Sequence, residues 1–595
     1  MEKESFENEK IASILNRYYI SVKVDKEEMP HIDAKYQKAL SKLTKIRNGW
    51  PLTVILTPKK EIFYIATYLP PSDKYSLKGL DKLLPQIAHI YYNDHKRAEK
   101  IINANKKLLS KKQNEPKPLK NSLVEEFLKR MGKRYDKIYK GFDLRPRYPL
   151  SSHLNLLFEI WLLTGNKRAS EMFFEPLTAM AKGGIYDQIE GGFFRYSSHP
   201  DWIIPHFEKM LYTQAELIPL YAKAFLFTGN PLYKKVALQT TEESIKIFMQ
   251  EEGLFYSATD ADSEGKEGGY FIYTFKEIKN ALSKEGFSEK EIEEIARYLD
   301  INEIGNFKGA YSNPQTNTGF YKEPEKLKKA LKVLQEIRKK RKFPFIDKKI
   351  ITSWNAMMIK ALFQVSLLDE KYKKRAIESL NGLIKKMYVK GELYHQYVKP
   401  HKISVKGVLE DYAFLIDALI EAYETVYDKR YLNLAKKLSE EAIRKFYDPK
   451  KRVWYLDNSD VKAEVVYQDR HYTAPLARFF NDLISIANLN YDRKLLYKTK
   501  TFIENEKNEI LKNLDSSPEA LKALIRMKYK DVILKSNAKN LIKYKKEINT
   551  IRYPFILTKT QDIERFSACT IDSCFAYEES LEKIKKEVGE KMQRR

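Results

Sequence analysis

The sequence predicts a multidomain protein in which a small α/β unit precedes a large all-α region. Three observations support this fold class. Roughly the first 95 residues alternate between amphipathic helical patterns and short strand patterns. From about residue 121, apolar helical segments follow one another with short polar turns between them. Several of these turns recur at a spacing of about 60 residues, which indicates repeated helical hairpins.

The composition narrows the class of protein further. The chain has 595 residues, of which 43% are hydrophobic and 31% charged, as in folded globular proteins with real cores. No apolar run approaches ~18 residues, so we expect no transmembrane helix. The N-terminal stretch MEKESFENEK lacks the apolar segment of a secretory signal. Two cysteines are too few for a disulfide framework or a four-cysteine zinc site, and their scarcity favours a cytoplasmic location.

The formal net charge of +27 raises the possibility of nucleic-acid binding. Both charge signs are abundant, however, which is also typical of Lys- and Glu-rich, thermophile-like compositions. Part of the excess lies in Leu521–Thr560, which is not rich in aromatic residues suited to base stacking. We therefore treat nucleic acid as an unlikely partner.

The α/β unit is expected at residues 1–95. Its predicted elements, in order, are a helix at Glu4–Asn16, a strand at Tyr19–Val24, a helix at Asp33–Leu43, strands at Leu52–Leu56 and Ile62–Thr67, and a helix at Leu80–Asn93. A turn at Lys59-Lys60 joins the last two strands. This order is typical of a compact α/β unit.

The segments MEKESFENEKIASILNRYYISVKVDKEEMPHID, NGWPLTVILTP and ATYLPP resemble the thioredoxin-like domain of the spermatogenesis-associated protein 20-like family. The resemblance implies a Cys-His-Trp-Cys-His motif directly before this helix, and the sequence begins just past that position. We therefore expect a truncated thioredoxin-like domain, without its first strand and catalytic turn and without dithiol chemistry. Pro51 matches the cis-proline of such folds; the alternative is a trans proline entering a strand.

Residues 96–120 are polar and basic and read as a linker. A ring of hairpins over residues 121–535 would form an (α/α)6 toroid, with an insertion near 274–345 and a small appendage at 536–595. In such a ring the short turns lie at one rim and the long loops at the other. The family resemblance extends here and implies a relation to the toroids of N-acylglucosamine 2-epimerases and six-hairpin glycosidases. We expect the strand-like Ile551–Leu557 to pair with the N-terminal sheet.

The first long loop, Gly183–Tyr212, is close to a signature of that family. It carries two carboxylates, a guanidinium and an imidazole (Asp187, Glu208, Arg195, His206), with aromatic faces suited to sugar rings (Tyr186, Phe193, Tyr196, Trp202). His206 is the best acid/base candidate because an imidazole titrates near neutrality. The alternative is that His206 and Glu208 belong to a structural hydrogen-bond network. Glu190 and Thr213 depart from the family pattern, which commonly has glycine and aspartate there.

Three further loops supply the remaining candidates. They are Asp260 and Asp262 on Gly253–Thr274, Trp354 and Asn355 after Asp347, and Asp411 and Tyr412 after Glu410. The alternatives are a solvated acidic turn for the first loop and a plain helix N-cap for Asn355. Because adjacent side chains point apart on a helix, at most one of Glu410 and Asp411 should face a pocket.

The fifth loop reads QDRHYTAPLARFF where the family carries a Gly/Ser-rich stretch, so His471 is either a substitute or merely exposed. Cys569 and Cys574 are spaced unlike a redox CxxC pair and are expected to be free thiols. No metal site and no cofactor are predicted.

We therefore predict a carbohydrate-directed barrel, of the epimerase/isomerase or glycosidase type, with a small carbohydrate as partner. The predicted catalytic residues are His206, Glu208, Asp187, Arg195 and Asp411. The predicted binding residues are Tyr186, Tyr196, Trp202, Asp260, Asp262, Trp354, Asn355 and Tyr412. They are expected to share one pocket at the long-loop rim. The alternatives are a non-catalytic interaction protein with vestigial sites, and a redox protein if the true N-terminus carries CxxC.

Overall fold

The structure is a computed structural model. It describes residues 2–46, 49–74, 76–110, 122–143, 146–316, 322–401, 403, 405–469 and 471–592. The chain divides into two compact units. The first comprises residues 1–115 together with 446–466, and the second comprises 116–445 together with 467–595. Each unit is described by itself.

The first unit is built on a β-hairpin with helices packed against it. After a π-helical turn (Glu2–Phe6), its elements are α1 (Glu9–Tyr18), α2 (Pro30–Thr44), β1 (Thr53–Leu56), β2 (Ile62–Ala66), α3 (Leu80–Asn93) and α4 (His95–Ser110). Strands β1 and β2 pair antiparallel, with Val54 opposite Ile65. Leu83 and Ile87 of α3 pack with Ile11 of α1 in one buried cluster. A short ladder of β17 (Tyr447–Asp448) and β18 (Val453–Trp454) completes the unit.

Two expectations for this unit are corrected and one is confirmed. The predicted strand Tyr19–Val24 is an extended segment outside the described β-ladders, with Ile20 and Val22 exposed. A strand pattern forms a ladder only where a second backbone segment lies beside it. The predicted linker begins with helix α4, which packs on α3 and β2; its remainder, 111–120, lies outside the described residues. The Trp50–Pro51 peptide bond is cis, as predicted.

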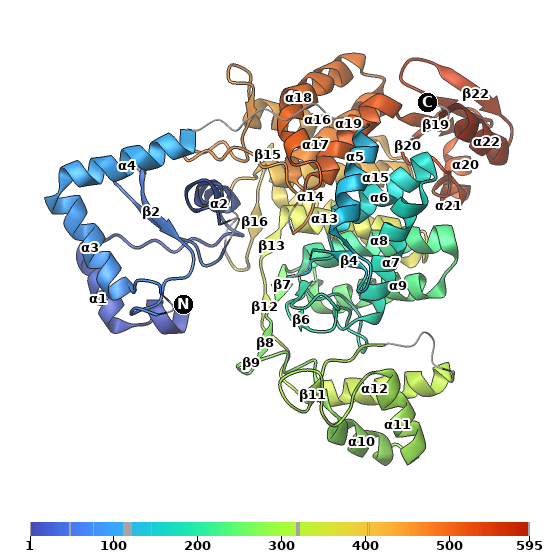
Figure 1. Cartoon of the computed structure of the whole chain (residues 1–595). Helices are drawn as coiled ribbons and strands as arrows, with labels where there is room; N and C mark the ends of the chain where they lie inside the picture. The colour runs from blue at the N-terminus through green and yellow to red at the C-terminus, as the bar shows by residue number, and fades with distance from the viewer. Residues whose placement is uncertain are drawn as a thin grey trace. The chain divides into compact units, whose positions relative to one another are not determined.

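The second unit contains six inner helices that close into a ring (Figure 1). The inner helices are α6 (Ser151–Thr164), α8 (Leu211–Thr228), α13 (Thr352–Val365), α15 (Leu409–Val426), α17 (Pro475–Asn490) and α19 (Pro518–Tyr529). Each contacts the next in that order, and α19 contacts α6. The outer helices are α5 (Leu123–Arg134), α7 (Lys167–Lys182), α9 (Pro231–Phe248), α14 (Lys371–Met387), α16 (Lys429–Phe446) and α18 (Arg493–Lys512). The predicted (α/α)6 toroid is confirmed.

The inner-to-outer turns are short because the sequence caps both helices within three residues. Gly165 and Gly229 end α6 and α8 with φ of +68°, a left-handed conformation that glycine adopts without steric cost. Asn166 and Asn230 follow as N-caps, each accepting a hydrogen bond from a backbone N–H of the next helix. The chain therefore reverses direction at these turns without strain.

The outer-to-inner connections are long, and two-residue ladders tie them together. The paired strands are β3 (Tyr135–Asp136) with β4 (Gly141–Phe142), β5 (Tyr196–Ser197) with β6 (Pro205–His206), β8 (Asp262–Ser263) with β9 (Lys266–Glu267), β7 (Ala258–Thr259) with β12 (Ile346–Asp347), β13 (Ile350–Ile351) with β16 (Gln396–Tyr397), and β14 (Tyr388–Val389) with β15 (Glu392–Leu393). All of them precede inner helices. They therefore gather the long loops at the rim where the inner helices begin.

Three helices between α9 and α13 form a cluster with its own core (Figure 1). They are α10 (Phe275–Lys284), α11 (Glu289–Tyr298) and α12 (Pro324–Lys339), preceded by β10 (Tyr273–Thr274), which pairs with β11 (Tyr311–Ser312). Ile278, Ile295 and Leu334 are fully buried among them. This cluster occupies the place in the chain where an insertion was predicted.

The C-terminal segment is a four-stranded sheet with helices. It contains β19 (Val532–Ser536), α20 (Ala538–Lys543), α21 (Lys545–Ile548), β20 (Ile556–Thr560), β21 (Phe566–Cys569), β22 (Cys574–Glu578) and α22 (Leu581–Met592). The strand order is β20-β19-β21-β22. The predicted pairing of Ile551–Leu557 with the N-terminal sheet is wrong, because β20 pairs in parallel with β19.

The prediction of two free thiols is also wrong. Cys569 and Cys574 lie opposite each other in the β21–β22 ladder and form a disulfide. Cross-strand neighbours bring their Cβ atoms close together, which sequence spacing alone does not reveal. No helix in the described part of the chain has the length and apolarity needed to cross a membrane.

Candidate functional site

Ten side chains at the beginnings of the inner helices form a continuous set of contacts, which we call the mouth cluster. They are Tyr148, Arg195, Tyr196, His206, Glu208, Tyr212, Trp354, Glu410, His471 and Tyr472. They come from the segments that precede or begin α6, α8, α13, α15 and α17. The closed ring brings together these segments, which are distant in sequence.

His206 lies at the centre of the charged part of this cluster. The β5–β6 ladder places it opposite Tyr196, and the two rings stack at 5.1 Å with an interplanar angle of 19°. Its Nε2 lies 3.5 Å from Oε2 of Glu208, and its Nδ1 lies 3.2 Å from Oε1 of Glu267. The imidazole is therefore held between two carboxylates.

These carboxylates change the proton affinity of the site. The hydrogen bond to Glu208 raises the pKa of His206, more than burial lowers it. Burial pushes the pKa of Glu208 upward, but the hydrogen bond from His206 and the charge of Arg195 outweigh it and lower that pKa to about 2. At neutral pH Glu208 is thus ionised, and His206 is biased toward its proton-donating form.

Arg195 connects the charged part of the cluster to its aromatic part. Its Nη1 lies 2.9 Å from Oε2 of Glu208, and its Nε donates a hydrogen bond of 3.1 Å to the hydroxyl of Tyr212. The Tyr212 ring contacts Trp354 at 4.9 Å and Tyr472 at 4.9 Å between centroids. Aromatic faces and charged groups therefore stand side by side.

Glu410 is the acid of the Glu410–Asp411 pair that joins the mouth cluster. Its carboxylate accepts hydrogen bonds from Ser353 Oγ at 2.6 Å and from the Tyr472 hydroxyl at 2.9 Å. Burial, followed by the charge of Asp411, raises the pKa of Glu410 to about 7. Glu410 therefore titrates near neutral pH.

Asp411, which the sequence analysis chose instead, serves the start of α15. It accepts the backbone N–H of Val408 at 2.9 Å and that of Ser353 at 3.2 Å. It also pairs with His395 at 2.8 Å. Because α15 begins at Leu409, an acid at position 411 can accept the backbone N–H of the N-cap residue Val408, whereas position 410 points elsewhere.

Asp187 and Tyr186 likewise lie outside the mouth cluster. Asp187 is fully buried and accepts hydrogen bonds from Lys209 Nζ and Arg338 Nη1, both at 2.9 Å. Burial alone would raise the pKa of Asp187, but the charges of Arg338 and Lys209 outweigh it and hold that pKa well below its usual range. Tyr186 donates to the side chain of Gln239 at 2.9 Å. Glu190, the family departure, pairs with Arg338 at 3.1 Å.

The remaining candidates also lie away from the mouth cluster. Trp202 is buried and donates to the carbonyl of Tyr139, Asn355 is buried and exchanges hydrogen bonds with the backbone of Phe255, and Tyr412 is buried and accepts from Lys445. Asp260 and Asp262 are exposed beside the β8–β9 turn. Of the predicted residues, the cluster therefore unites Arg195, Tyr196, His206, Glu208 and Trp354.

Several members of the site were missed by sequence reasoning. Tyr148, Tyr212, Glu410 and Tyr472 were not chosen, and neither was Glu267, the second acid beside His206. A signal existed for Tyr212, since it lies within the first turn of an inner helix and so at the rim, as the predicted Trp354 does. No local pattern marks Tyr148 or Glu267.

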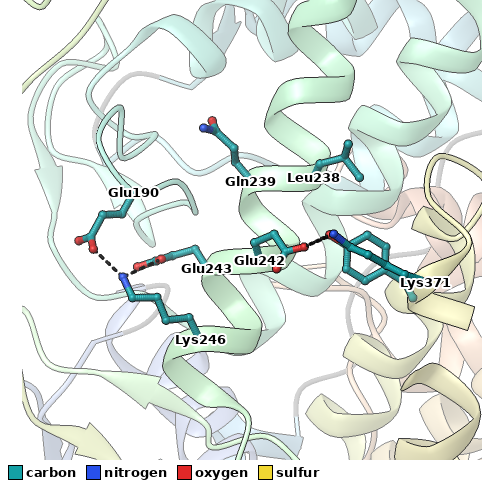
Figure 2. A pocket seen from close by; sticks show the side chains of 8 residues that line it. Glu190, Leu238, Gln239, Glu242, Glu243, Lys246 and Lys371 are labelled. Carbon is teal, nitrogen blue, oxygen red and sulfur yellow. Dashed lines mark hydrogen bonds and ion pairs between the residues drawn. The ribbon is translucent and has the colours of Figure 1, made fainter. Parts of the chain in front are cut away.

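Two described cavities lie away from the mouth cluster. One, of about 320 Å³, is lined by Glu190, Leu238, Gln239, Glu242, Glu243, Lys246, Lys371 and Tyr372. Figure 2 shows Lys246 reaching both Glu190 and Glu243 there, while Glu242 meets Lys371. The other, of about 480 Å³, lies at the opposite ends of the hairpins near Trp161, Tyr529 and Arg552. Among the described residues, no group of three His, Cys, Asp or Glu side chains is arranged to hold a metal ion.

Comparison with known proteins adds a family. A family model described as "Thioredox_DsbH: Protein of unknown function, DUF255" matches residues 1–111, which confirms the predicted thioredoxin-like assignment. "Spermatogenesis-associated protein 20" of Mus musculus is 30% identical over 516 residues, covering 78% of this chain and 65% of that protein. "Uncharacterized protein B0495.5" of Caenorhabditis elegans is 30% identical, covering 75% of this chain and 67% of that protein. The chain thus spans 65% of the length of the mouse and human relatives.

The solved structures that the chain resembles are more distant. A D-mannose isomerase gives a TM-score of 0.43 at 13% identity, covering 66% of this chain and 88% of that chain. The GH76 α-mannanase BT2949 of Bacteroides thetaiotaomicron gives 0.40 at 11% identity, covering 72% and 98%. The description of the fold therefore rests on the helix contacts given above.

Proposed function

Because the chain belongs to the spermatogenesis-associated protein 20-like family, we propose that its helical barrel binds a carbohydrate at the mouth cluster. There it removes a proton from a carbon atom of the carbohydrate and returns one. The observation that carries the proposal is the placement of His206, between two carboxylates and stacked on Tyr196.

The composition of the cluster fits a polyhydroxylated ligand. Aromatic rings cover the C–H faces of a sugar, and charged groups satisfy its hydroxyls. Tyr196, Tyr212 and Trp354 supply the first kind of surface, and Arg195 with Glu208 supplies the second. Both kinds occur within one set of contacts.

The proton affinities of the cluster fit isomerisation or epimerisation. Moving a C–H proton requires two acid/base groups. Glu410, with a pKa raised to about 7, and His206, whose pKa is raised by its hydrogen bond to Glu208, can supply them. Glycoside hydrolysis is the alternative, because it needs one protonated and one ionised carboxyl group, which Glu410 and Glu208 would supply.

Solvent-exchange NMR tests this function. The full-length protein is incubated in D2O with a panel of aldoses and 1,4-linked disaccharides, and deuterium incorporation at C2 is followed. We expect exchange with at least one sugar and a loss of roughly 100-fold or more in His206→Ala. His199→Ala is the matched control, since His199 is exposed on the same loop and outside the cluster. Exchange that survives in His206→Ala contradicts the assignment.

A second candidate function is a non-catalytic interaction protein. It is favoured by the fifth loop, QDRHYTAPLARFF, which departs from the Gly/Ser-rich stretch of the family. The same experiment separates the two candidates, because a binding protein shows saturation-transfer signals from a sugar without deuterium incorporation. Absence of both signals across the panel would remove the carbohydrate proposal altogether.

The scarcity of cysteine supports a cytoplasmic location as part of this proposal. The Cys569–Cys574 disulfide argues against a cytoplasmic location, because cytosolic thiols are normally kept reduced. The number of free thiols per chain decides between a cytoplasmic and an oxidising location. It is counted on denatured protein that was alkylated at the moment of cell lysis. Two free thiols per chain fit the cytoplasm.

A further inference from the structure

The inner helices carry charged and amide side chains that face one another across the interior of the ring; we call them the interior belt. They are Asn155 and Glu159 on α6, Lys223 on α8, Lys360 and Gln364 on α13, Asp417 and Glu421 on α15, Arg478 and Asp482 on α17, and Glu519 and Lys522 on α19. On five of these helices the two belt residues are three or four positions apart, so they lie on the same face of the helix.

Electrostatic coupling places the belt inside the ring rather than at its outer surface. The charge of Lys360 acts on Asp482 and on Glu519, which belong to α17 and α19. Neither of those helices is a ring neighbour of α13. Charges on non-neighbouring inner helices affect one another only across the interior.

Most cations of the belt are neutralised by a carboxylate. Lys360 pairs with Asp417 at 2.7 Å, and Lys522 pairs with Glu159 at 2.5 Å. Arg478 lies 3.1 Å from Glu519. In each pair the charges of the two side chains compensate each other.

Lys223 is different. Its Nζ donates a hydrogen bond of 2.7 Å to the amide oxygen of Asn155, a neutral acceptor. Within the described ranges it takes part in no ion pair of 4 Å or less. Burial lowers the pKa of Lys223 to about 8; Lys522 and Lys360 act in the same direction, while Glu159 and Glu421 oppose it. A sizeable fraction of this amine is therefore neutral and nucleophilic near physiological pH.

Glu159 is the carboxylate whose charge acts most strongly on that amine, and it shares the side chain of Asn155 with it. Its Oε1 accepts hydrogen bonds from Asn155 Nδ2 at 3.0 Å and from Lys522 Nζ at 2.5 Å. Its Oε2 is buried and has no hydrogen-bond partner among the described residues. A buried carboxylate oxygen without a donor is costly, and a hydroxyl brought by a ligand would satisfy it.

We propose that Lys223 captures a small aldehyde or ketone as an imine inside the barrel. The neutral Nζ attacks the carbonyl carbon, and a proton moves from nitrogen to oxygen to give a carbinolamine. Through one intervening water, Glu159 accepts a proton from the nitrogen and returns it to the hydroxyl, which leaves as water when the C–O bond breaks. Amine and carbonyl thus become imine and water, with no oxidant or reductant. The chemistry uses α6, α8 and α19 and does not rest on the mouth cluster.

Reductive trapping tests the proposal on the full-length protein. Glycolaldehyde and sodium cyanoborohydride are added at pH 7, and peptide mass spectrometry locates the hydroxyethyl group. At this pH a lysine with a pKa near 8 is neutral roughly 300-fold more often than one near 10.5. We therefore expect labelling of Lys223 at least 10-fold faster than that of Lys167, whose side chain is 89% exposed. Labelling of Lys223 no faster than Lys167, or not at all, overturns the proposal.

Two variants and a pH profile make the result specific. Lys360→Arg, in the ion-paired position, should leave the labelling of Lys223 unchanged, and Lys223→Arg should remove the fast site while circular dichroism stays native. If Lys223→Arg does not fold, the wild-type profile decides instead. A labelling midpoint near pH 8 supports the proposal, and one above pH 10 marks Lys223 as an ordinary structural lysine.

Discussion

At the scale of single residues, the protonation of His206 should contribute to stability in a pH-dependent way. Its folded-state pKa is raised above its usual value, so its contribution is present at pH values below that usual value and is lost as the pH rises through the folded-state pKa. His206→Ala should therefore lower Tm more at pH 5.5 than at pH 9. We expect the loss of unfolding free energy at the two pH values to differ by less than about 1 kcal/mol, because the side chain is partly exposed.

Thermal denaturation at the two pH values measures this effect, with His199→Ala as the control. An equal loss at both pH values would mean that the carboxylates of Glu208 and Glu267 do not stabilise the charged imidazole. A loss of several kcal/mol at both would support a purely structural role for His206.

Glu410 should contribute a pH dependence of the same sign as His206. Its pKa is raised to about 7, so the folded protein binds a proton that the unfolded chain releases between about pH 4.5 and 7. Stability should therefore fall as the pH rises through this window. In Glu410→Gln this fall should be reduced by up to about 3 kcal/mol, since a neutral amide has no proton to release. Urea unfolding at pH 4.5 and 7.5 gives the comparison, and an unchanged slope in the variant would refute it.

At the scale of elements, the inner-to-outer turns depend on a left-handed residue at the helix end. Gly165 has φ of +68° and an added Cβ would meet nothing within 4 Å, so Gly165→Ala carries a conformational cost alone. We expect a loss of about 1 kcal/mol. Gly589 lies within α22, where an added Cβ also meets nothing, so Gly589→Ala should stabilise by about 0.5–1 kcal/mol. Urea unfolding measures both variants, and the same sign for both would contradict the argument.

The helix α12 is tied to the first long loop by a buried ion pair. Arg338 is 1% exposed and contacts both oxygens of Asp187 at 2.9 Å, across 151 residues of sequence. Arg338→Met leaves buried acids uncompensated and should cost about 3–5 kcal/mol. Lys339→Ala, at the adjacent exposed position, should change stability by less than about 0.5 kcal/mol. Similar losses in the two variants would remove this role for Arg338.

At the scale of the whole molecule, part of the basic excess behind the net charge of +27 has internal partners. The basic stretch Leu521–Thr560 shows this most clearly. Arg526 is buried against Asp531, Lys522 pairs with Glu159 inside the barrel, and Lys545 donates to the backbone of Glu424. These cations are committed to internal contacts and are not available to phosphates.

We therefore expect only weak, non-specific binding to nucleic acid. Fluorescence anisotropy with a labelled 20-base-pair duplex should show binding at 50 mM salt, if any, that disappears by 200 mM, because counterion release drives it. Binding that persists at 200 mM salt would require a dedicated phosphate-binding surface and would restore nucleic acid as a partner.

Much of the architecture follows from local patterns in the sequence. The hairpin turns are visible because Thr-Gly-Asn places a left-handed glycine and an N-cap next to each other at Gly165 and Gly229. The inner helices are visible because they are apolar on nearly every side. The rim position of His206 and Trp354 follows as well, because each precedes or begins an inner helix.

The site itself was predicted less well. Five of the predicted residues meet in the mouth cluster, whereas Asp187, Trp202 and Asn355 are buried in contacts that maintain the scaffold. A carboxylate or an aromatic ring has the same appearance in a sequence whether it faces a ligand or a buried partner. The partner of Asp187 lies on α12, and no local pattern points to it.

The sequence by itself determined the α/β unit followed by helical hairpins, the family, the cis-proline Pro51 and the rim that holds the long loops. Only the tertiary structure decided that Glu410 rather than Asp411 joins the mouth cluster, that Cys569 bonds to Cys574, and that Lys223 donates to the neutral amide of Asn155. The physical reason is the separation along the sequence over which each feature is set. Periodicity, caps and turns are set within a few residues, whereas the partner of a buried charge or strand is set by how distant segments pack.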